Sequence, residues 1–231
     1  MARPKTWMIT TSLGCILVAL GGAVASNIAF KLPFQLTGPA ASGGQGTGNN
    51  LISLPYRPKA ALTNAYQLML DIGGGSITPV NNITKYNTTN DALIVYNGRM
   101  TSPTPTPFAL AAGEAYMVKM NGNVNYVIVG AHDSTVAVQL NAPGSGSASG
   151  KYWLAVPYNA TAATALDLML DIGGGSITPV NSVARYNRTN DTLIAYNGRM
   201  TSPTPTPFAL TAGEGYFVQM NSTVSYVPAH Y

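Results

Sequence analysis

The sequence predicts a mainly β protein with two tandem β-sandwich or barrel-like domains, each with one short helix, and an N-terminal donor strand. Three observations lead to this prediction. The 231 residues include 24 Gly and 16 Pro, which favours a turn-rich β protein over a helical one. Residues 68–128 match residues 168–228 without a gap, and 46 of the 61 paired positions are identical. A repeat of this length indicates two whole domains, because it is too long for a solenoid. An alternating apolar segment precedes the first copy.

Residues 1–25 have the features of a secretory signal peptide. Arg3 and Lys5 precede an uncharged, largely apolar stretch with an Ala-x-Ala end, so we expect cleavage after Ala25. The alternative is a retained anchor, since about 20 apolar residues span a bilayer, but Gly, Thr and Ser interrupt this stretch. Because Cys15 lies in the leader, the mature chain would use neither disulfides nor thiol chemistry. We expect a secreted protein, extracellular or at the cell surface, that meets the membrane only during export.

Each copy consists mostly of predicted strands around one helix. Residues 63–72 predict a helix that ends at three consecutive glycines, and Thr164 with Asp167 approximates a capping box in the second copy. The Asn-Gly pairs at 97–98 and 121–122 follow strand patterns and predict two-residue hairpins. Between them lies TSPTPTPFAL, whose prolines cannot donate to a ladder. We expect that segment to be extended and at the surface.

Two similar strands lie outside the two matched copies. Apolar side chains in the first strand alternate with other residues, which is the period of a strand with one buried face. These polymerisation-strand residues are Ile28, Phe30, Leu32, Phe34 and Leu36. A second segment matches the first at an offset of 104 residues, with Val136, Val138 and Leu140 in equivalent positions. Both segments run into linkers rich in Gly and Ser.

These patterns predict the order of parts along the chain. We expect a leader (1–25), a donor strand (26–37), a linker (38–50), a β domain (51–141) with its own last strand (134–140), a linker (142–150), and a β domain (151–231) that lacks its last strand. The donor strand would complete the second domain of the next subunit. Because donor and acceptor surfaces differ, copies of the chain would form a head-to-tail polymer. The alternatives are a strand that folds back on the second domain of its own chain, and a monomer in which the segment is a tether.

The chain also resembles a known kind of domain. Residues 50–55, the end of the predicted helix at 71–74 and the Gly-Glu-x-Tyr-x-Val pattern at 113–118 resemble repeat domains of secreted bacterial surface proteins. The resemblance covers most of both copies, although the second copy departs from the pattern at residues 152–157. It carries no catalytic residue and implies an extracellular structural or adhesive module, assembled like donor-strand-complemented pilus or fibre subunits.

The composition excludes several classes of function. Only 9% of residues are charged and the net charge of +4 is scattered, whereas a nucleic-acid binder needs clustered Lys and Arg. Two His and one Cys leave little for a metal or thiol site. The repeated carboxylates match no calcium loop, and turn or capping roles are expected for Asp71, Asp91, Glu114, Asp171, Asp191 and Glu214. Because no nucleophile–His–acid set is visible, we expect no enzyme, no catalytic residue, no cofactor and no metal.

Sugar chemistry provides the remaining possibilities. Six Asn-x-Ser/Thr sequons could carry glycan in a secreted chain, and they begin at Asn82, Asn87, Asn159, Asn187, Asn190 and Asn221. The repeated tyrosines offer either strand packing or a sugar-binding face. The alternative function of another class is therefore a monomeric carbohydrate-binding or adhesive module, with cell-surface glycans as the partner.

Overall fold

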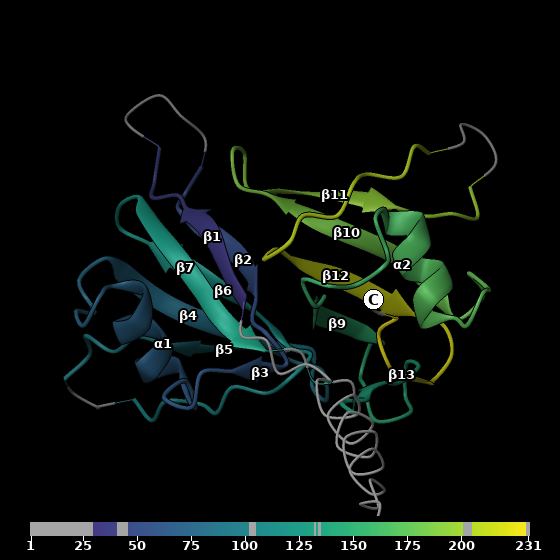
Figure 1. The fold of residues 1–231 in the computed structure, drawn as a ribbon. Coiled ribbons are helices and arrows are strands. Elements are labelled where there is room, and N and C mark those ends of the chain that lie inside the picture. Colours follow the sequence, from purple (N-terminus) through teal and green to yellow (C-terminus); the bar gives the residue numbers. More distant parts are fainter. Residues whose placement is uncertain are drawn as a thin grey trace, which may run out of the picture.

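The computed structural model is mainly β, with several antiparallel sheets and two short helices in the part that it describes (Figure 1). It describes residues 30–40, 46–101, 105–131, 133, 135–200 and 205–229. The predicted leader and Ile28 of the predicted donor strand lie outside these residues. Within the described segments, neither helix has the length and apolar composition that a membrane crossing requires.

The first copy, residues 30–131, contains two sheets and a helix. The larger sheet has the strand order β2-β6-β4-β5, from β2 (Asn49–Ser53), β6 (Ala115–Met120), β4 (Val80–Asn87) and β5 (Ala92–Tyr96). The smaller sheet has the order β1-β7-β3, from β1 (Phe30–Leu36), β7 (Val124–Ala131) and β3 (Arg57–Pro58). Helix α1 (Ala65–Ile72) packs against β4 and β7.

The second copy, residues 135–229, repeats this plan with a smaller second sheet. Its larger sheet has the order β11-β10-β12-β9, from β11 (Thr192–Tyr196), β10 (Val180–Asn187), β12 (Gly215–Met220) and β9 (Lys151–Ala155). Its smaller sheet pairs β13 (Val224–Tyr226) with β8 (Val138–Leu140). Helix α2 (Ala165–Ile172) packs against β10.

Local sequence explains both helices, and the predicted positions are confirmed except that α1 begins at Ala65, two residues later than predicted. The N-cap of α1 is Asn64, whose side chain accepts a hydrogen bond from the backbone N–H of Gln67 at 3.1 Å. In α2 the predicted capping box is present, because the side chains of Thr164 and Asp167 each accept a bond from the other residue's backbone. Each helix ends at a glycine and buries one apolar face, formed in α1 by Ala65, Leu68, Met69 and Ile72.

The two predicted Asn-Gly hairpins are not formed. At 97–98 the chain turns, with the N–H of Met100 bonded to the carbonyl of Asn97 at 3.2 Å, but β4 is the only strand that pairs with β5 in the described part of the chain. The hairpin joins β4 to β5 instead, and its turn ends at Asp91, which has a φ of 57°. The pair at 121–122 joins β6 to β7, which lie in different sheets. The Asn-Gly pairs therefore predicted the positions of the turns correctly. They did not predict which strands pair, because that depends on which strand faces are buried.

Each copy has its own hydrophobic core, and the first strand of each copy completes that core. Phe34 and Leu36 of β1 belong to the first core, while Leu140 of β8 belongs to the second. The prediction that residues 134–140 complete the first copy is therefore wrong, since β8 pairs with β13. The physical reason is that β1 already occupies the edge of β7 that β8 would need, since Leu36 lies opposite Val124 as Leu140 lies opposite Val224 in the second copy. The prediction that the domain at 151–231 lacks its last strand is also wrong, because β8 occupies that place in the second copy.

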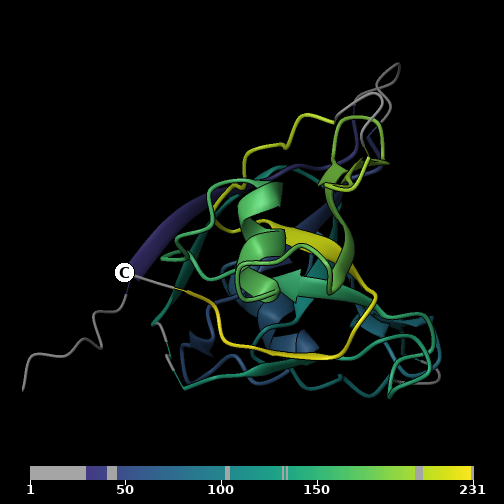
Figure 2. The same ribbon diagram turned by 90° about the vertical axis from the view of Figure 1, so that its right-hand side faces the viewer.

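The two copies lie side by side (Figure 1), and the second copy stands in front of the first in the view turned by 90° (Figure 2). They contact each other through reciprocal hydrogen bonds between equivalent residues, which indicates an approximate two-fold relation. The N–H of Ser53 bonds to the carbonyl of Gly213 at 2.8 Å, and the N–H of Ala155 bonds to the carbonyl of Gly113 at 2.9 Å. Near the centre, a Cβ on Gly215 would overlap the Cβ of Ala115. The contact therefore has room for one methyl group and not for two.

Candidate strand-binding sites

Strand β1 shows the alternation that its sequence predicts. Leu36 is fully buried and Phe34 is 8% exposed, whereas Lys31, Pro33 and Gln35 point to solvent. All seven residues pair antiparallel with β7, from Phe30 opposite Gly130 to Leu36 opposite Val124. The expected polymerisation strand is thus seated in the first copy of its own chain, and neither in a free position nor on β13.

The first strand site is the place of β1, between β7 and the loop of the second copy that carries Gly213. Gly213 has a φ of 86°, and a Cβ there would lie 2.7 Å from the ring of Phe34 and 3.0 Å from Leu32. Glycine is needed at position 213 because its backbone is left-handed and because β1 approaches it closely. The site is therefore built from both copies: one supplies the ladder and the other supplies the opposing wall.

The second strand site is the place of β8, between β13 and the loop of the first copy that carries Gly113. Gly113 has a φ of 81°, and a Cβ there would overlap a methyl of Val138. The ladder covers only three residues, from Val138 opposite Tyr226 to Leu140 opposite Val224. In the repeat, Pro228 stands where the first copy has Ile128. Because proline has no N–H, β13 cannot extend as far as β7 does.

The end of each strand is held by a side chain at an equivalent position of the repeat. The N–H of Thr37 donates to Oδ1 of Asn50 at 3.0 Å, and Nδ2 of Asn50 donates to the carbonyl of Thr37 at 2.9 Å. In the second copy the hydroxyl of Tyr152 accepts from the N–H of Asn141 at 2.6 Å and donates to its carbonyl at 3.3 Å. The two sites thus hold the strand terminus in the same way with different side chains.

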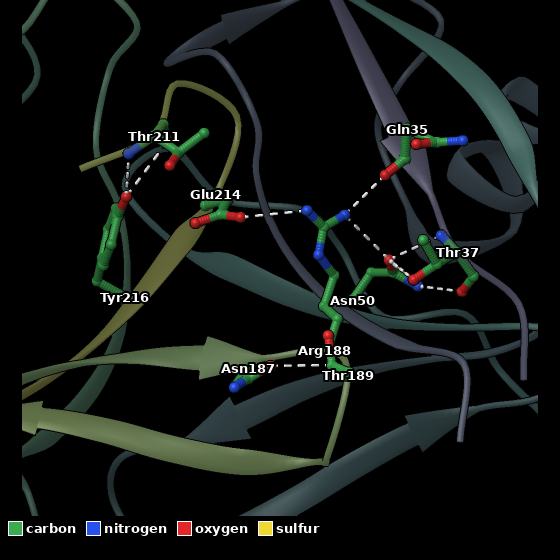
Figure 3. A network of polar contacts seen from close by, with 9 residues as sticks. All are labelled: Gln35, Thr37, Asn50, Asn187, Arg188, Thr189, Thr211, Glu214 and Tyr216. Atoms are coloured by element: carbon green, nitrogen blue, oxygen red, sulfur yellow. Dashed lines mark hydrogen bonds and ion pairs between the residues drawn. The ribbon is translucent and has the colours of Figure 1, made fainter. Parts of the chain in front are cut away.

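Arg188 distinguishes the first strand site from the second (Figure 3). It lies in the turn between β10 and β11, and its guanidinium donates to the carbonyl of Gln35 at 2.7 Å and to Glu214 at 3.3 Å. Its Cζ is 5.3 Å from the centroid of the Phe34 ring. A side chain of the second copy therefore holds a strand of the first by a charged hydrogen bond and by a cation–π contact. The equivalent residue in the first copy is Thr88.

A second contact between the copies involves a titrating group. The N–H of Thr47 donates to Asp191 at 2.7 Å, and the hydroxyl of Tyr186 donates to the same carboxylate. Burial and this hydrogen bond raise the pKa of Tyr186 to about 12. Burial opposes ionisation of Asp191, but the bonds from Tyr186 and Thr47 outweigh it and lower the pKa of the carboxyl. Asp191 therefore favours this contact in its charged form.

The other repeated carboxylates have structural partners. Asp71 accepts from the hydroxyl of Tyr126 at 2.8 Å, and Asp171 accepts from Tyr226 at 2.7 Å. Desolvation raises the pKa of both tyrosines, so they stay neutral donors. Among the described residues, no group of three or more His, Cys, Asp and Glu side chains could hold a metal ion. His132 and His230 lie outside those residues.

The six sequons differ in accessibility. Asn159 is only 5% exposed, and its Oδ1 has no hydrogen-bond partner among the residues that the structure describes. A glycan on Asn159 would therefore require its loop to leave the surface of the second copy. Asn190 and Asn221 are exposed. The side chains of the remaining three, Asn82, Asn87 and Asn187, are half-buried.

An apolar cleft of about 430 Å³ lies where the larger sheet of the second copy meets the first copy. The Trp153 ring stacks with Tyr86 at a centroid distance of 5.8 Å and contacts the Phe217 ring edge-on at 5.5 Å. Asp91 and Lys151 form an ion pair at 3.4 Å among the lining residues. The cleft is an aromatic surface with a polar rim.

Sequence reasoning missed Arg188 and Trp153. The available signal was the difference between the copies, because Thr88 and Leu51 occupy the equivalent positions. Comparison of the chain with models of protein families, with curated proteins and with solved structures found no match. The function is therefore inferred from the chain's own residues and contacts.

Proposed function

We propose that this chain is the secreted structural subunit of an extracellular filament, and that neighbouring subunits are joined head to tail by exchange of β1. The observation that carries the proposal is the seating of β1. Phe34 and Leu36 are buried in the first core, yet β1 is joined to β2 through the linker that follows Leu36. The same contacts can therefore form between molecules, as in domain swapping.

The acceptor in this proposal is the first copy, and not the second copy that the sequence pattern favoured. The ladder on β7 accommodates all seven residues of β1, whereas β13 offers three and already holds β8. Full burial of Phe34 and Leu36 contributes on the order of 3–6 kcal/mol before ordering costs. An exchanged strand would keep this contribution, so assembly would lose only the freedom of the associating subunits. Donor and acceptor surfaces differ, so the contact repeats into an open polymer unless it closes into a ring.

The test uses two single-cysteine forms of the chain without residues 1–25, which otherwise contains no cysteine. Lys31 and Val129 are directly opposite in the β1–β7 ladder. Mixing Lys31→Cys with Val129→Cys under oxidising conditions should give a disulfide-linked pair of chains, and electron microscopy should show fibres. The control is Lys31→Cys mixed with Ala229→Cys, because residue 229 is equivalent to residue 129 in the repeat. Cross-linking only in the control mixture would identify the second copy as acceptor, and monomers in both would refute strand exchange.

A second candidate function is binding of cell-surface glycans, and the aromatic cleft favours it. Trp153, Tyr86 and Phe217 offer rings, and Asp91 with Lys151 offers polar partners for hydroxyl groups. Binding to a glycan array that is lost in Trp153→Ala would support this function. The matched control is Leu93→Ala, an exposed residue of the same cleft. Unchanged binding in Trp153→Ala would exclude the cleft as the sugar site.

A further inference from the structure

The two strand sites are equivalent in backbone but differ in what fills them. The ring of Phe34 and the guanidinium of Arg188 lie together in the first site. In the second site the equivalent residues are Val138 and Thr88, both smaller. A cavity of about 230 Å³ lies beside them, lined by Val138, Thr88, Gly113 and Glu114 among others. The second site therefore lacks the pair of side chains that fills the first.

One contact of Arg188 depends on which side chain the bound strand carries, and another does not. The bond to the carbonyl of Gln35 is available to any strand in this register. The contact with Phe34 requires an aromatic ring, because a cation is attracted to the face of a ring and not to a valine. Glu214 holds the other end of the guanidinium at 3.3 Å, and its side chain is 16% exposed. Arg188 is thus held in position by a carboxylate of its own copy.

The equivalent acid in the first copy has a different partner. Glu114 accepts a hydrogen bond from the hydroxyl of Tyr116 at 3.0 Å. The carbonyl of Thr88 accepts from the N–H of Ala148 at 2.8 Å, so that turn contacts the linker before β9. In the part of the chain that the structure describes, no cation–π contact involves β8. The charged contact to a seated strand is therefore specific to the first site.

We propose that Arg188 and Phe34 form a matched pair that determines strand specificity. The pair directs the N-terminal strand of a second copy of this chain into the first strand site, and it rejects β8 there, because Val138 leaves the guanidinium without a ring. This inference rests on the proposed strand exchange for its biological use, but the pairing itself acts in any form of the protein. Glu214 is a positioning residue for Arg188.

The experiment measures strand selection without requiring fibres. A protease site placed within residues 41–45 of the chain lacking residues 1–25 is cut, which leaves β1 held without a covalent link. Labelled peptides of residues 26–40, with Phe34 or with Phe34→Val, then compete for the site. Replacing Arg188 by Thr should reduce the preference for the Phe34 peptide about threefold to thirtyfold, which is the range of one cation–π contact. The peptide preference of Arg188→Lys should lie between those of wild type and Arg188→Thr, because lysine keeps the charge but not the planar group.

A reciprocal variant tests the same pair in the other site. Thr88→Arg combined with Val138→Phe should fill the cavity and raise the unfolding midpoint above that of either single variant. If cutting releases β1, the double-mutant cycle of Arg188→Thr and Phe34→Val in the uncut chain measures the same coupling from denaturant unfolding. An unchanged peptide preference, or a coupling factor near one in the cycle, overturns the inference. If the first strand site prefers the Phe34 peptide but the protein forms no fibres, the filament proposal is overturned and this inference stands.

Discussion

Replacement of Leu36 by Ala tests whether β1 is part of the first core. Leu36 has no exposed surface and belongs to that core. Deleting a fully buried leucine side chain beyond Cβ costs about 2–5 kcal/mol, because transfer energy is lost and a cavity remains. We expect a loss of about 3 kcal/mol in the free energy of unfolding, measured by urea denaturation. Gln35→Ala is the control, since its side chain is exposed and Arg188 bonds to its backbone carbonyl. It should change stability by no more than about 0.5 kcal/mol.

The equivalent residue in the second copy makes the test local. Leu140 is also fully buried, and it belongs to the second core. Hydrogen exchange should therefore accelerate along β7 in Leu36→Ala and along β13 in Leu140→Ala, because each strand pairs with one copy. If Leu36→Ala costs less than about 1 kcal/mol, or if both variants accelerate exchange in both copies equally, the assignment of one strand to each core is incorrect.

Three further predictions concern the contact between copies and a helix. Gly215→Ala should destabilise the chain by about 1–3 kcal/mol through overpacking against Ala115, and adding Ala115→Gly should restore most of this loss in thermal melts. Because the pKa of Asp191 is lowered in the folded chain, its ionised carboxylate stabilises the fold at pH values above the unfolded pKa of about 4. That contribution should decline from this value and disappear as pH falls through the lowered pKa of the folded carboxyl, so the unfolding free energies of wild type and Asp191→Asn should converge in acid; a constant difference from pH 7 to pH 2 would contradict this. Thr164→Ala should cost about 1 kcal/mol by removing the cap of α2, and a loss below about 0.3 kcal/mol in urea would show that the capping box does not support the helix.

Local features of the fold followed from the sequence because local physics determines them. The helix ends depend on capping groups within four residues, and the alternation in β1 depends on the pleat of a single strand. The two copies were visible because identical residues recur at a fixed offset. Each of these features can be recognised without knowing which segments meet in space.

Strand partners could not be predicted in the same way. β1 and β8 match each other at an offset of 104, so either strand fits either copy by pattern alone. In the structure each strand takes the same edge of its own copy, β1 on β7 and β8 on β13. Which strand reaches which copy depends on how the chain folds in space, and this is a tertiary effect that no periodicity reports.

Only part of the candidate site could be predicted from the sequence, for a related reason. The buried face of β1 follows from its alternation, but Arg188 approaches it from the other copy, 153 residues away along the chain. Only the difference between Thr88 and Arg188 marked this position, and a difference between repeats does not say what the side chain contacts. The same limit applies to Trp153, whose neighbour Tyr86 belongs to the first copy.

The construction of the first strand site from both copies has a consequence for assembly. A strand that enters this site pairs with β7 and also packs against Gly213 and Arg188 of the other copy. It therefore binds well only when the two copies hold their mutual arrangement. Gly215→Ala, which disturbs that arrangement at Ala115, should then weaken binding of the β1 peptide, although the atoms nearest to the added Cβ belong to Ala115, Leu51 and Ile52. A donated strand would in turn fix the two copies of its acceptor against each other, so each junction would stiffen the subunit that receives it.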